Sequence, residues 1–346
     1  MSPDAVVQRL WYGPAWLSLP LWPLAWLFRA AVALRRLLYR HGLLRTHVVG
    51  VPVIVVGNVT VGGTGKTPVA AWLARELGLR GRRVGVVLRG YRGRHSGRAR
   101  RVSVADAPRD VGDEALMHVA RRPHVVAIGA DRVAAARLAE EEGAEVIVCD
   151  DGLQHLRLAR DCEIAVVDAE RGFGNGQMLP AGPLREPPSR IERTQAVVLT
   201  VRGEGKWASM GLRGPRVVTA HFGLGDAVSL LSGERRALAE FSGKAVHALA
   251  AIGHPQAFFA GLRDAGIEVV ARALPDHASP DPSSLPFPAD ATVLMTEKDA
   301  VKCQPFARPG WWFVELGVHI DRAEAAALLD TVIERTGLTG AGVKLG

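Results

Sequence analysis

The stretch Val53-Ile-Val-Val-Gly-Asn-Val-Thr-Val-Gly-Gly-Thr-Gly-Lys-Thr67 decides the fold of this chain. It opens with a run of β-branched residues, which predicts a buried strand. A glycine-rich turn follows, and residues 68–77 then predict a helix with proline in its first turn, where the missing N–H costs little. Strand, glycine loop, Gly-Lys-Thr and helix in this order indicate a phosphate-binding loop. Backbone N–H groups and the positive end of the helix dipole both favour an anion there.

The same loop predicts the contacts to a nucleotide and its metal ion. We expect Lys66 to reach the β- and γ-phosphates and the Thr67 hydroxyl to hold Mg²⁺. The usual pattern has glycine where Thr60 stands, so we expect Gly62 and Gly63 to provide the turn. The alternative is a glycine-rich turn with an incidental lysine, but strand, Gly-Lys-Thr and helix all agree with a nucleotide site. The predicted ATP-binding residues are Thr60, Val61, Gly62, Gly63, Thr64, Gly65, Lys66 and Thr67.

Size and charge limit the kind of protein this is. The chain has 346 residues, enough for two domains that each bury a core. Its 48% hydrophobic and 23% charged residues are typical of a globular protein. The formal net charge of +8, mainly from arginine, favours an anionic partner: nucleic acid, a phosphorylated substrate or an acidic membrane. The three cysteines lack C-x-x-C spacing, which favours reduced thiols over disulfides or a zinc site.

The N-terminal composition differs from that of the rest of the chain. No charged residue occurs from Trp11 to Phe28, four of the eight tryptophans lie in this run, and five arginines follow by residue 45. Prolines and tryptophans argue against a secretory signal, and the prolines interrupt a transmembrane span of ~20 residues. Tryptophan prefers the headgroup level and arginine suits anionic lipid. We therefore expect residues 1–48 to be a membrane-associated helical segment in the interface, rather than a span or a soluble hairpin.

An acidic motif follows a second apolar strand. The run Glu145-Val-Ile-Val-Cys-Asp-Asp-Gly-Leu-Gln-His155 has the form of a Walker B segment, in which a carboxylate at a strand end orients Mg²⁺. We expect Asp150 or Asp151 to do so. Two adjacent carboxylates repel each other unless a cation lies near, so a plain surface turn is the weaker alternative. Gln154 and His155 come just past the strand end and are placed to support the metal ligands.

Three further segments contain candidate residues. Arg89-Gly-Tyr-Arg-Gly93 follows a predicted strand, and ligands bind at the carboxyl ends of strands in open α/β sheets. This basic loop is either a phosphate- or headgroup-binding loop or a solvated surface loop. Asp113 stands at the start of the next predicted helix, as either a helix cap or a functional carboxylate. The Gly- and Pro-rich loop 172–188 is of a length that is usually functional or disordered.

Predicted strands and helices alternate along the chain after residue 53 and predict two domains. A P-loop domain is expected over residues 49–202, a linker with four glycines over 203–215, and a smaller domain over 216–346 that ends in a helix at 322–336. Two consecutive β-α-β arrays imply an α/β fold of two Rossmann-like parallel-sheet domains that face a cleft. The predicted strands after the P-loop lie at residues 84–88, 125–128, 145–149, 164–168, 197–201, 246–252, 267–271, 292–295 and 311–316.

Seven short motifs run the length of the chain. They are, in order, Gly57-Asn-Val-Thr-Val-Gly-Gly-Thr-Gly-Lys-Thr-Pro68, Arg89-Gly-Tyr91, Gly112-Asp-Glu114, Asp150-Asp-Gly-Leu-Gln-His155, Arg185-Glu-Pro187, Asp276-His277 and Thr296-Glu-Lys-Asp299. Together they resemble the tetraacyldisaccharide 4'-kinases of lipid A biosynthesis, a family in which threonine at the position of Thr60 is usual. Leu153 stands where phenylalanine is common and Arg92 where glycine is common, and we expect neither change to affect the chemistry.

The resemblance implies an activity, a place and partners. The activity is transfer of the γ-phosphoryl group of ATP, with Mg²⁺, to the 4'-hydroxyl of a tetraacyldisaccharide 1-phosphate lipid, which gives lipid IV-A for lipopolysaccharide. The fold would be two Rossmann-like domains joined by a short strand-containing linker. The protein would lie, peripheral or monotopic, at the cytoplasmic face of the bacterial inner membrane. Its partners would be the lipid substrate and the membrane surface, with no nucleic acid and no obligate protein partner.

The resemblance also implies residue roles. The base of the family corresponds to Asp113 with His277, one from each predicted domain, so the pair would form only when the cleft closes. Lys66 is the third implied catalytic residue. The implied metal ligands are Thr67, Asp150, Asp151 and Glu186, and the implied residues that contact or support the substrate are Asn58, Arg89, Tyr91, Gln154, His155 and Arg185.

Two other classes of function stay open at this point. A soluble P-loop regulatory NTPase that acts on a protein or metallocofactor partner would hydrolyse nucleotide without lipid and would have no use for the tryptophan-rich segment. A nucleic-acid-binding module is suggested only by the net charge of +8, and the basic loop 89–101 lacks the interleaved aromatic residues typical of such a module.

Overall fold

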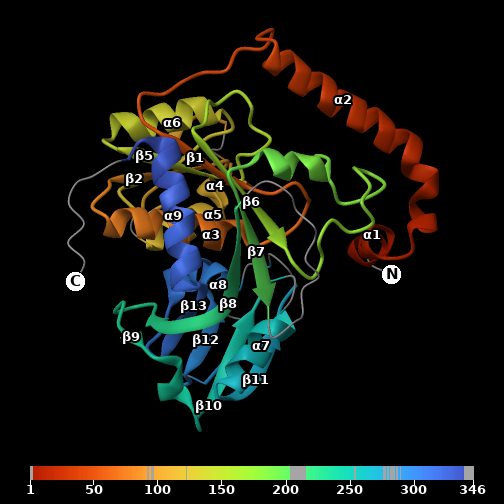
Figure 1. Cartoon of the computed structure of the whole chain (residues 1–346). Helices are drawn as coiled ribbons and strands as arrows, with labels where there is room; N and C mark the ends of the chain where they lie inside the picture. The colour runs from red at the N-terminus through yellow and green to blue at the C-terminus, as the bar shows by residue number, and fades with distance from the viewer. Residues whose placement is uncertain are drawn as a thin grey trace.

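Both predicted arrays of strands belong to one mixed sheet in the computed structural model (Figure 1). The structure describes residues 3–91, 93–94, 97–121, 123–202, 216–252, 255–275, 278, 280, 285, 287–288 and 290–338. The strands are β1 (Val53–Gly57), β2 (Val84–Leu88), β3 (Arg100–Arg101), β4 (Val125–Ile128), β5 (Val146–Asp150), β6 (Cys162–Asp168), β7 (Ala196–Arg202), β8 (Arg216–Ser229), β9 (Arg235–Arg236), β10 (Ala245–Ala250), β11 (Glu268–Ala273), β12 (Val293–Thr296) and β13 (Trp311–Ile320). Within the described ranges their order is β11-β10-β12-β13-β8-β7-β6-β1-β5-β2-β4-β3, with β9 paired to β8.

Strand β1 lies inside the sheet and pairs in parallel with both β5 and β6. Its side chains alternate between two cores, with Ile54 and Val56 in one and Val53 and Val55 in the other. Because the parallel sheet is buried on both faces, the strand is a continuous β-branched run rather than an alternating one. Helices α3 (Lys66–Leu79) and α9 (Arg322–Thr336) contribute to the first core, and α6 (Arg132–Glu141) contributes to the second.

The predicted elements around the glycine loop are confirmed with small shifts. The strand extends to Gly57, and the helix begins at Lys66 rather than at Pro68, because Gly65 takes the N-cap position. The structure also describes, after the N-terminal segment, the helices α4 (Pro108–Val111), α5 (Asp113–Ala120), α7 (Pro255–Asp264) and α8 (Glu297–Cys303), with 3₁₀ turns η2 (Pro188–Arg193), η3 (Leu238–Phe241) and η5 (Gln304–Phe306).

Strand β8 joins the two arrays, and no strand was predicted there. It pairs in parallel with β7 and antiparallel with β13. Its central residues Gly223, Gly225 and Asp226 have low strand propensity, which hides it in the sequence. The two predicted arrays are therefore halves of one continuous sheet. Helix α9 also returns to pack on the first half through Leu328, Leu329 and Val332, whereas the predicted linker 203–215 lies outside the described residues.

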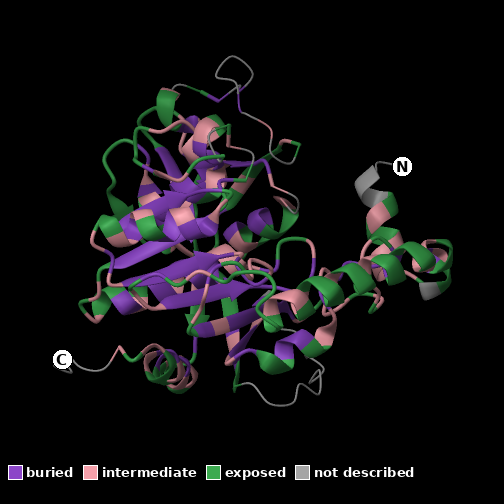
Figure 2. Cartoon of the chain, turned by 90° about the horizontal axis from the view of Figure 1, so that it is seen from above, coloured by how far each residue is buried: buried purple, intermediate pink, exposed green. Residues whose placement is uncertain are grey.

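The N-terminal segment projects from one side of the molecule, although one face of it contacts the rest of the chain (Figures 1 and 2). It consists of α1 (Pro3–Tyr12), η1 (Ala15–Leu21) and α2 (Trp22–Arg40), and among the described residues of α2 only Ala25 is buried. The stretch Trp16–Arg40 is long and apolar enough to cross a membrane, and 11% of its most apolar window is buried. The predicted helical segment is thus present, and it exposes large apolar side chains: Trp16, Leu19, Leu24, Trp26, Leu27, Leu34 and Leu37.

Candidate active site

The glycine loop connects β1 to α3 and is shaped by two glycines. Gly62 has φ 113° and Gly65 has φ 84°, a backbone conformation that other residues rarely adopt. A Cβ at Gly65 would also lie 2.3 Å from the ring of Phe222. Gly62 therefore provides the turn that the usual first glycine would give, and Gly63 does not share this backbone conformation.

Asn58 is the centre of the hydrogen bonds that hold this loop. Its side chain is buried, and its Nδ2 donates to Thr64 Oγ1 at 2.9 Å and to Thr60 Oγ1 at 3.3 Å. Its Oδ1 accepts from Lys66 Nζ at 3.2 Å and from Arg185 Nη2. Asn58, expected to contact or support the substrate, therefore fixes the loop and both of its cations.

Asp151 adds a negative charge beside these two cations. Its carboxylate accepts from Arg185 at 3.0 and 3.3 Å, and it lies 3.7 Å from Lys66 Nζ. Burial alone would raise the pKa of Asp151, but the charges of Lys66 and Arg185 outweigh it and hold the pKa below its ordinary value. Asp151 also has φ 54°, rare for a residue other than glycine and often found at functional sites. The carboxylate therefore stays ionised and positioned at the loop.

Asp150, at the end of β5, is the second acidic residue of the predicted metal site. It is 2% exposed, its Oδ2 lies 3.1 Å from His118 Nε2, and its Oδ1 has no hydrogen-bond partner within the described residues. Mg²⁺ is usually held by one or two carboxylates together with phosphate oxygens and water. The orphaned oxygen fits that arrangement. Among the described residues, no group of three or more His, Cys, Asp or Glu side chains could hold a metal ion.

Asp113 is the first residue of α5 and does not cap it. The N-cap is Gly112, whose φ of 87° and close approach to Tyr91 O leave no room for a side chain. Asp113 Oδ2 lies 3.6 Å from Lys302 Nζ of α8, and Lys302 Nζ donates to Ala278 O at 3.0 Å. The interpretation of Asp113 as a helix cap is therefore wrong. His277 lies outside the described residues, although Ala278 follows it directly in the sequence.

A second set of predicted site residues, Gln154, Glu186 and His155, supports the glycine loop or lies near it. Gln154 Nε2 donates to Asn58 O at 2.9 Å and to Glu186 Oε1 at 3.0 Å. Glu186 is buried and faces Arg36 of α2, so its carboxylate already has protein partners, and its metal-binding role stays a prediction.

Burial, followed by the nearby arginine charges, lowers the pKa of His155 to about 4. His155 is therefore neutral near pH 7, and its Nε2 accepts from the backbone N–H of Arg132.

Arg89 and Tyr91 follow β2 at the same sheet edge as Asp150, since β2 pairs in parallel with β5. Both are exposed, and Tyr91 is 64% exposed. The structure thus leaves them accessible at this edge of the sheet, and their contact with a substrate stays a prediction. Arg92, the position that differs from the family, lies outside the described residues.

Three residues at the site were missed by the sequence interpretation. His118 is buried against Asp150 and lies one helical turn after Glu114, so helical periodicity from the Gly112-Asp-Glu114 motif could have found it. Desolvation by surrounding protein and the charge of Asp150 raise the pKa of Glu114, although its side chain still reaches solvent. Arg36 contacts Glu186 across 150 positions of sequence, and no local signal predicts that contact.

The glycine loop is surrounded by a lysine, an arginine and the carboxylates at the end of β5. This arrangement defines the class of the protein, which is a P-loop phosphotransferase. The family model described as tetraacyldisaccharide-1-P 4'-kinase matches residues 17–334, and the chain belongs to that family. The family resemblance seen in the sequence is therefore confirmed, and the chain is an ATP-using kinase.

Several known proteins are similar over nearly their whole length. The tetraacyldisaccharide 4'-kinase of Thiobacillus denitrificans is 46% identical, with 90% of this chain and 94% of the relative covered. That of Methylobacillus flagellatus is 44% identical, with 93% and 94% covered. The crystal structure of the "apo" form of LpxK from Aquifex aeolicus in complex with ATP has a TM-score of 0.79 at 28% identity and covers 92% of this chain and 99% of that one.

Proposed function

We propose that this kinase transfers the γ-phosphoryl group of ATP to the 4'-hydroxyl of a tetraacyldisaccharide 1-phosphate lipid, giving lipid IV-A in lipid A biosynthesis. The observation that carries the proposal is the cluster of Lys66, Arg185 and Asp151 around Asn58 at the glycine loop. The same chain exposes an apolar N-terminal helix. A phosphoryl-transfer site and a surface suited to lipid occur together, as an acylated sugar substrate requires.

Phosphoryl transfer depends mainly on positioning and on neutralising charge. Lys66 and Arg185 supply two cations, and Asn58 accepts a hydrogen bond from each, which fixes both charges at the glycine loop. Bound Mg²⁺ would neutralise the phosphate oxygens. Thr67, Asp150 and Asp151 would hold the metal ion, with its remaining ligands from phosphate and water.

A base is needed because a sugar hydroxyl is a weak nucleophile. We assign that function to Asp113 with His277. Lys302 connects Asp113 to the carbonyl of Ala278, next in sequence to His277, and this contact supports the assignment. An imidazole of ordinary pKa, ~6.5, can accept the proton, and the carboxylate would orient the ring and stabilise its cation.

Transfer of label from [γ-³²P]ATP to the disaccharide 1-phosphate lipid in detergent micelles tests the function. We expect label in the lipid, and little ATP hydrolysis when the lipid is omitted, because the acceptor completes the site. If ATP is hydrolysed at the same rate with and without the lipid and the lipid takes up no label, the result would instead support the soluble P-loop NTPase.

We also place the enzyme at the cytoplasmic face of the bacterial inner membrane, where ATP and the acylated substrate meet. The exposed apolar residues of α2 support an interfacial anchor, and the arginines of α2 suit anionic headgroups. No nucleic acid and no obligate protein partner enter this proposal.

A double substitution on the exposed face of α2 should weaken membrane binding. Leu27 and Leu34 are 69% and 57% exposed and lie two helical turns apart on one face. Burial of a leucine side chain is worth about 1.5–3 kcal/mol, so Leu27→Ser with Leu34→Ser should lower vesicle partitioning by about tenfold or more. High salt should release the wild-type protein only partly, because apolar burial is not screened. Co-sedimentation with vesicles measures both effects.

The matched control is Leu79→Ser with Val104→Ser, which removes two apolar side chains that are 70% and 85% exposed outside the N-terminal segment. This control should sediment like the wild type. Equal losses in the two double variants would show that general surface hydrophobicity, and not α2, attaches the protein to membranes.

A further inference from the structure

The loop 172–188 contacts the N-terminal segment at one end and the glycine loop at the other. On the N-terminal side, the Asn175 N–H donates to Trp11 O at 2.8 Å, and Trp11 Nε1 donates to Pro180 O at 3.1 Å. On the nucleotide side, the Val61 N–H donates to Pro183 O and the Arg185 N–H donates to Val59 O, both at 2.7 Å. The position of this loop is therefore set from both sides.

A continuous series of side-chain contacts runs beside this loop from α2 to the catalytic lysine. Arg36 Nη1 lies 3.2 Å from Glu186 Oε2, and Glu186 Oε1 accepts from Gln154 Nε2 at 3.0 Å. The same Gln154 nitrogen donates to Asn58 O, and Asn58 Oδ1 accepts from Lys66 at 3.2 Å. Four contacts thus connect a guanidinium on the N-terminal helix to the cation of the glycine loop.

The ion pair between Arg36 and Glu186 is the one contact of this series that depends on the position of α2. Glu186 is 3% exposed, and its Oε2 has no hydrogen bond within the described residues. Two ion pairs balance that oxygen: Arg36 at 3.2 Å and Arg190 Nε at 3.5 Å. Arg190 also pairs with Glu163, so it is shared between two carboxylates. Removal of Arg36 would leave a buried carboxylate that is poorly compensated.

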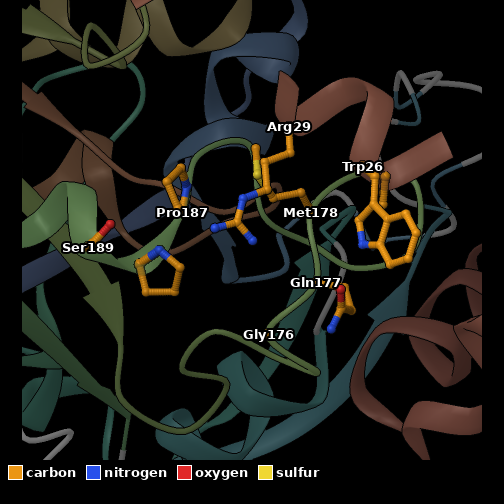
Figure 3. Close-up of a pocket in the computed structure, with 9 residues that line it drawn as sticks. Trp26, Arg29, Gly176, Gln177, Met178, Pro187 and Ser189 are labelled. Carbon is orange, nitrogen blue, oxygen red and sulfur yellow. The ribbon is translucent and has the colours of Figure 1, made fainter. Parts of the chain in front are cut away.

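The junction between α2 and the rest of the molecule has packed and open parts. Phe28 and Val32 pack against the second core, whereas two cavities lie along the helix. Trp26 and Arg29 of α2 line a cavity of about 190 Å³ together with Met178 and Pro187. Figure 3 shows these side chains. A second cavity of about 740 Å³ lies along the same helix and is lined by Arg36 and Arg190. Only part of α2 is therefore held by packed side chains, so a shift of the helix against the loop would break fewer contacts than in a closely packed interior.

We infer that Arg36 is a positioning residue through which the seating of α2 on a membrane sets the geometry of the glycine loop. On the membrane, α2 holds Arg36 against Glu186, and Gln154 and Asn58 keep Lys66 in the nucleotide-binding position. Away from the membrane, α2 shifts, Glu186 loses its main counter-ion, and the series of contacts loosens. The inference rests on the proposed membrane placement, and it makes nucleotide binding dependent on the surface where the lipid substrate lies.

The test compares the Kd of a fluorescent, non-hydrolysable ATP analogue with Mg²⁺ in the presence and absence of phosphatidylglycerol-containing vesicles. The wild-type chain should bind the analogue about fivefold or more tightly on vesicles, in the usual range of coupling between two sites. Arg36→Gln should bind with equal Kd in both conditions while still sedimenting with vesicles. Arg36→Lys keeps the charge and should restore part of the difference.

Arg35→Gln is the matched control, because Arg35 is adjacent, exposed and lies over the Tyr39 ring at 5.8 Å. It should keep the full vesicle effect. An Arg36→Gln variant with the wild-type vesicle effect overturns the inference, and so does a wild-type protein that sediments without any change in Kd. A wild-type protein that does not sediment overturns the membrane placement as well. Lipid phosphorylation in micelles is a separate measurement and can succeed or fail independently.

Discussion

Lys66→Ala is expected to lower kcat/KM by about 10³-fold or more, the range seen when a preorganised charge-stabilising group is removed. Lys66 is fixed by Asn58 at 3.2 Å and by Asp151 at 3.7 Å, so its charge is held at the glycine loop. Its loss would also leave Asp151 with Arg185 as its main counter-ion. Steady-state kinetics with the lipid substrate at several ATP concentrations measure the effect.

The control for this prediction is Lys244→Ala. Lys244 is exposed, lies just before β10 and donates to Glu240 O of η3, so this substitution removes the same charge at a residue outside the site. It should keep the activity of the wild type. Turnover near wild type in Lys66→Ala would mean that this loop does not hold the reacting ATP.

The second large effect is expected at the proposed base. Asp113→Ala and His277→Ala should each lose about 10²–10⁴-fold in kcat, the usual contribution of general base catalysis. The double variant should lose about as much as the worse single variant, because members of one catalytic unit are not additive. The acid limb of the pH profile of kcat/KM should disappear in His277→Ala. Kinetics at saturating ATP with all three variants measure these effects.

Two further variants separate chemistry from structure at Asp113. Asp113→Asn keeps the size of the side chain and should still lose most activity, because the carboxylate charge is gone. Lys302→Gln removes the ion pair that links α5 to α8 and should lose much less. Equal losses in these two variants, together with multiplicative losses in the double alanine variant, would show that Asp113 only holds α8 in place.

The sequence predicted the parts of the fold and site that depend on local chemistry. The β-branched run at Val53, the glycine loop and the helix after it are determined by neighbouring residues, and each was found within about two residues of its predicted bounds. The strand ending at Asp150 was predicted for the same reason, since a buried apolar run followed directly by two carboxylates is typical of a strand that ends at a metal site.

Features that depend on long-range contacts could not be predicted. The pairing of β8 with both β7 and β13 converts two arrays into one sheet, and the glycines of β8 conceal it. The contacts of Asn58 with Arg185 and of Arg36 with Glu186 join segments more than one hundred positions apart. Helical periodicity places His118 on the same face as Glu114, but its contact with Asp150, 32 positions away, is long-range and is shown only by the structure.

The position of the transferred phosphate tests the central claim most directly. Phosphorus NMR of the lipid product, made from ATP and the disaccharide 1-phosphate lipid, should show a second phosphomonoester coupled to the proton at the 4' carbon. A substrate whose 4'-hydroxyl is methylated should give no product. A phosphomonoester at another hydroxyl, a diphosphate at position 1, or release of inorganic phosphate without lipid product would contradict the account.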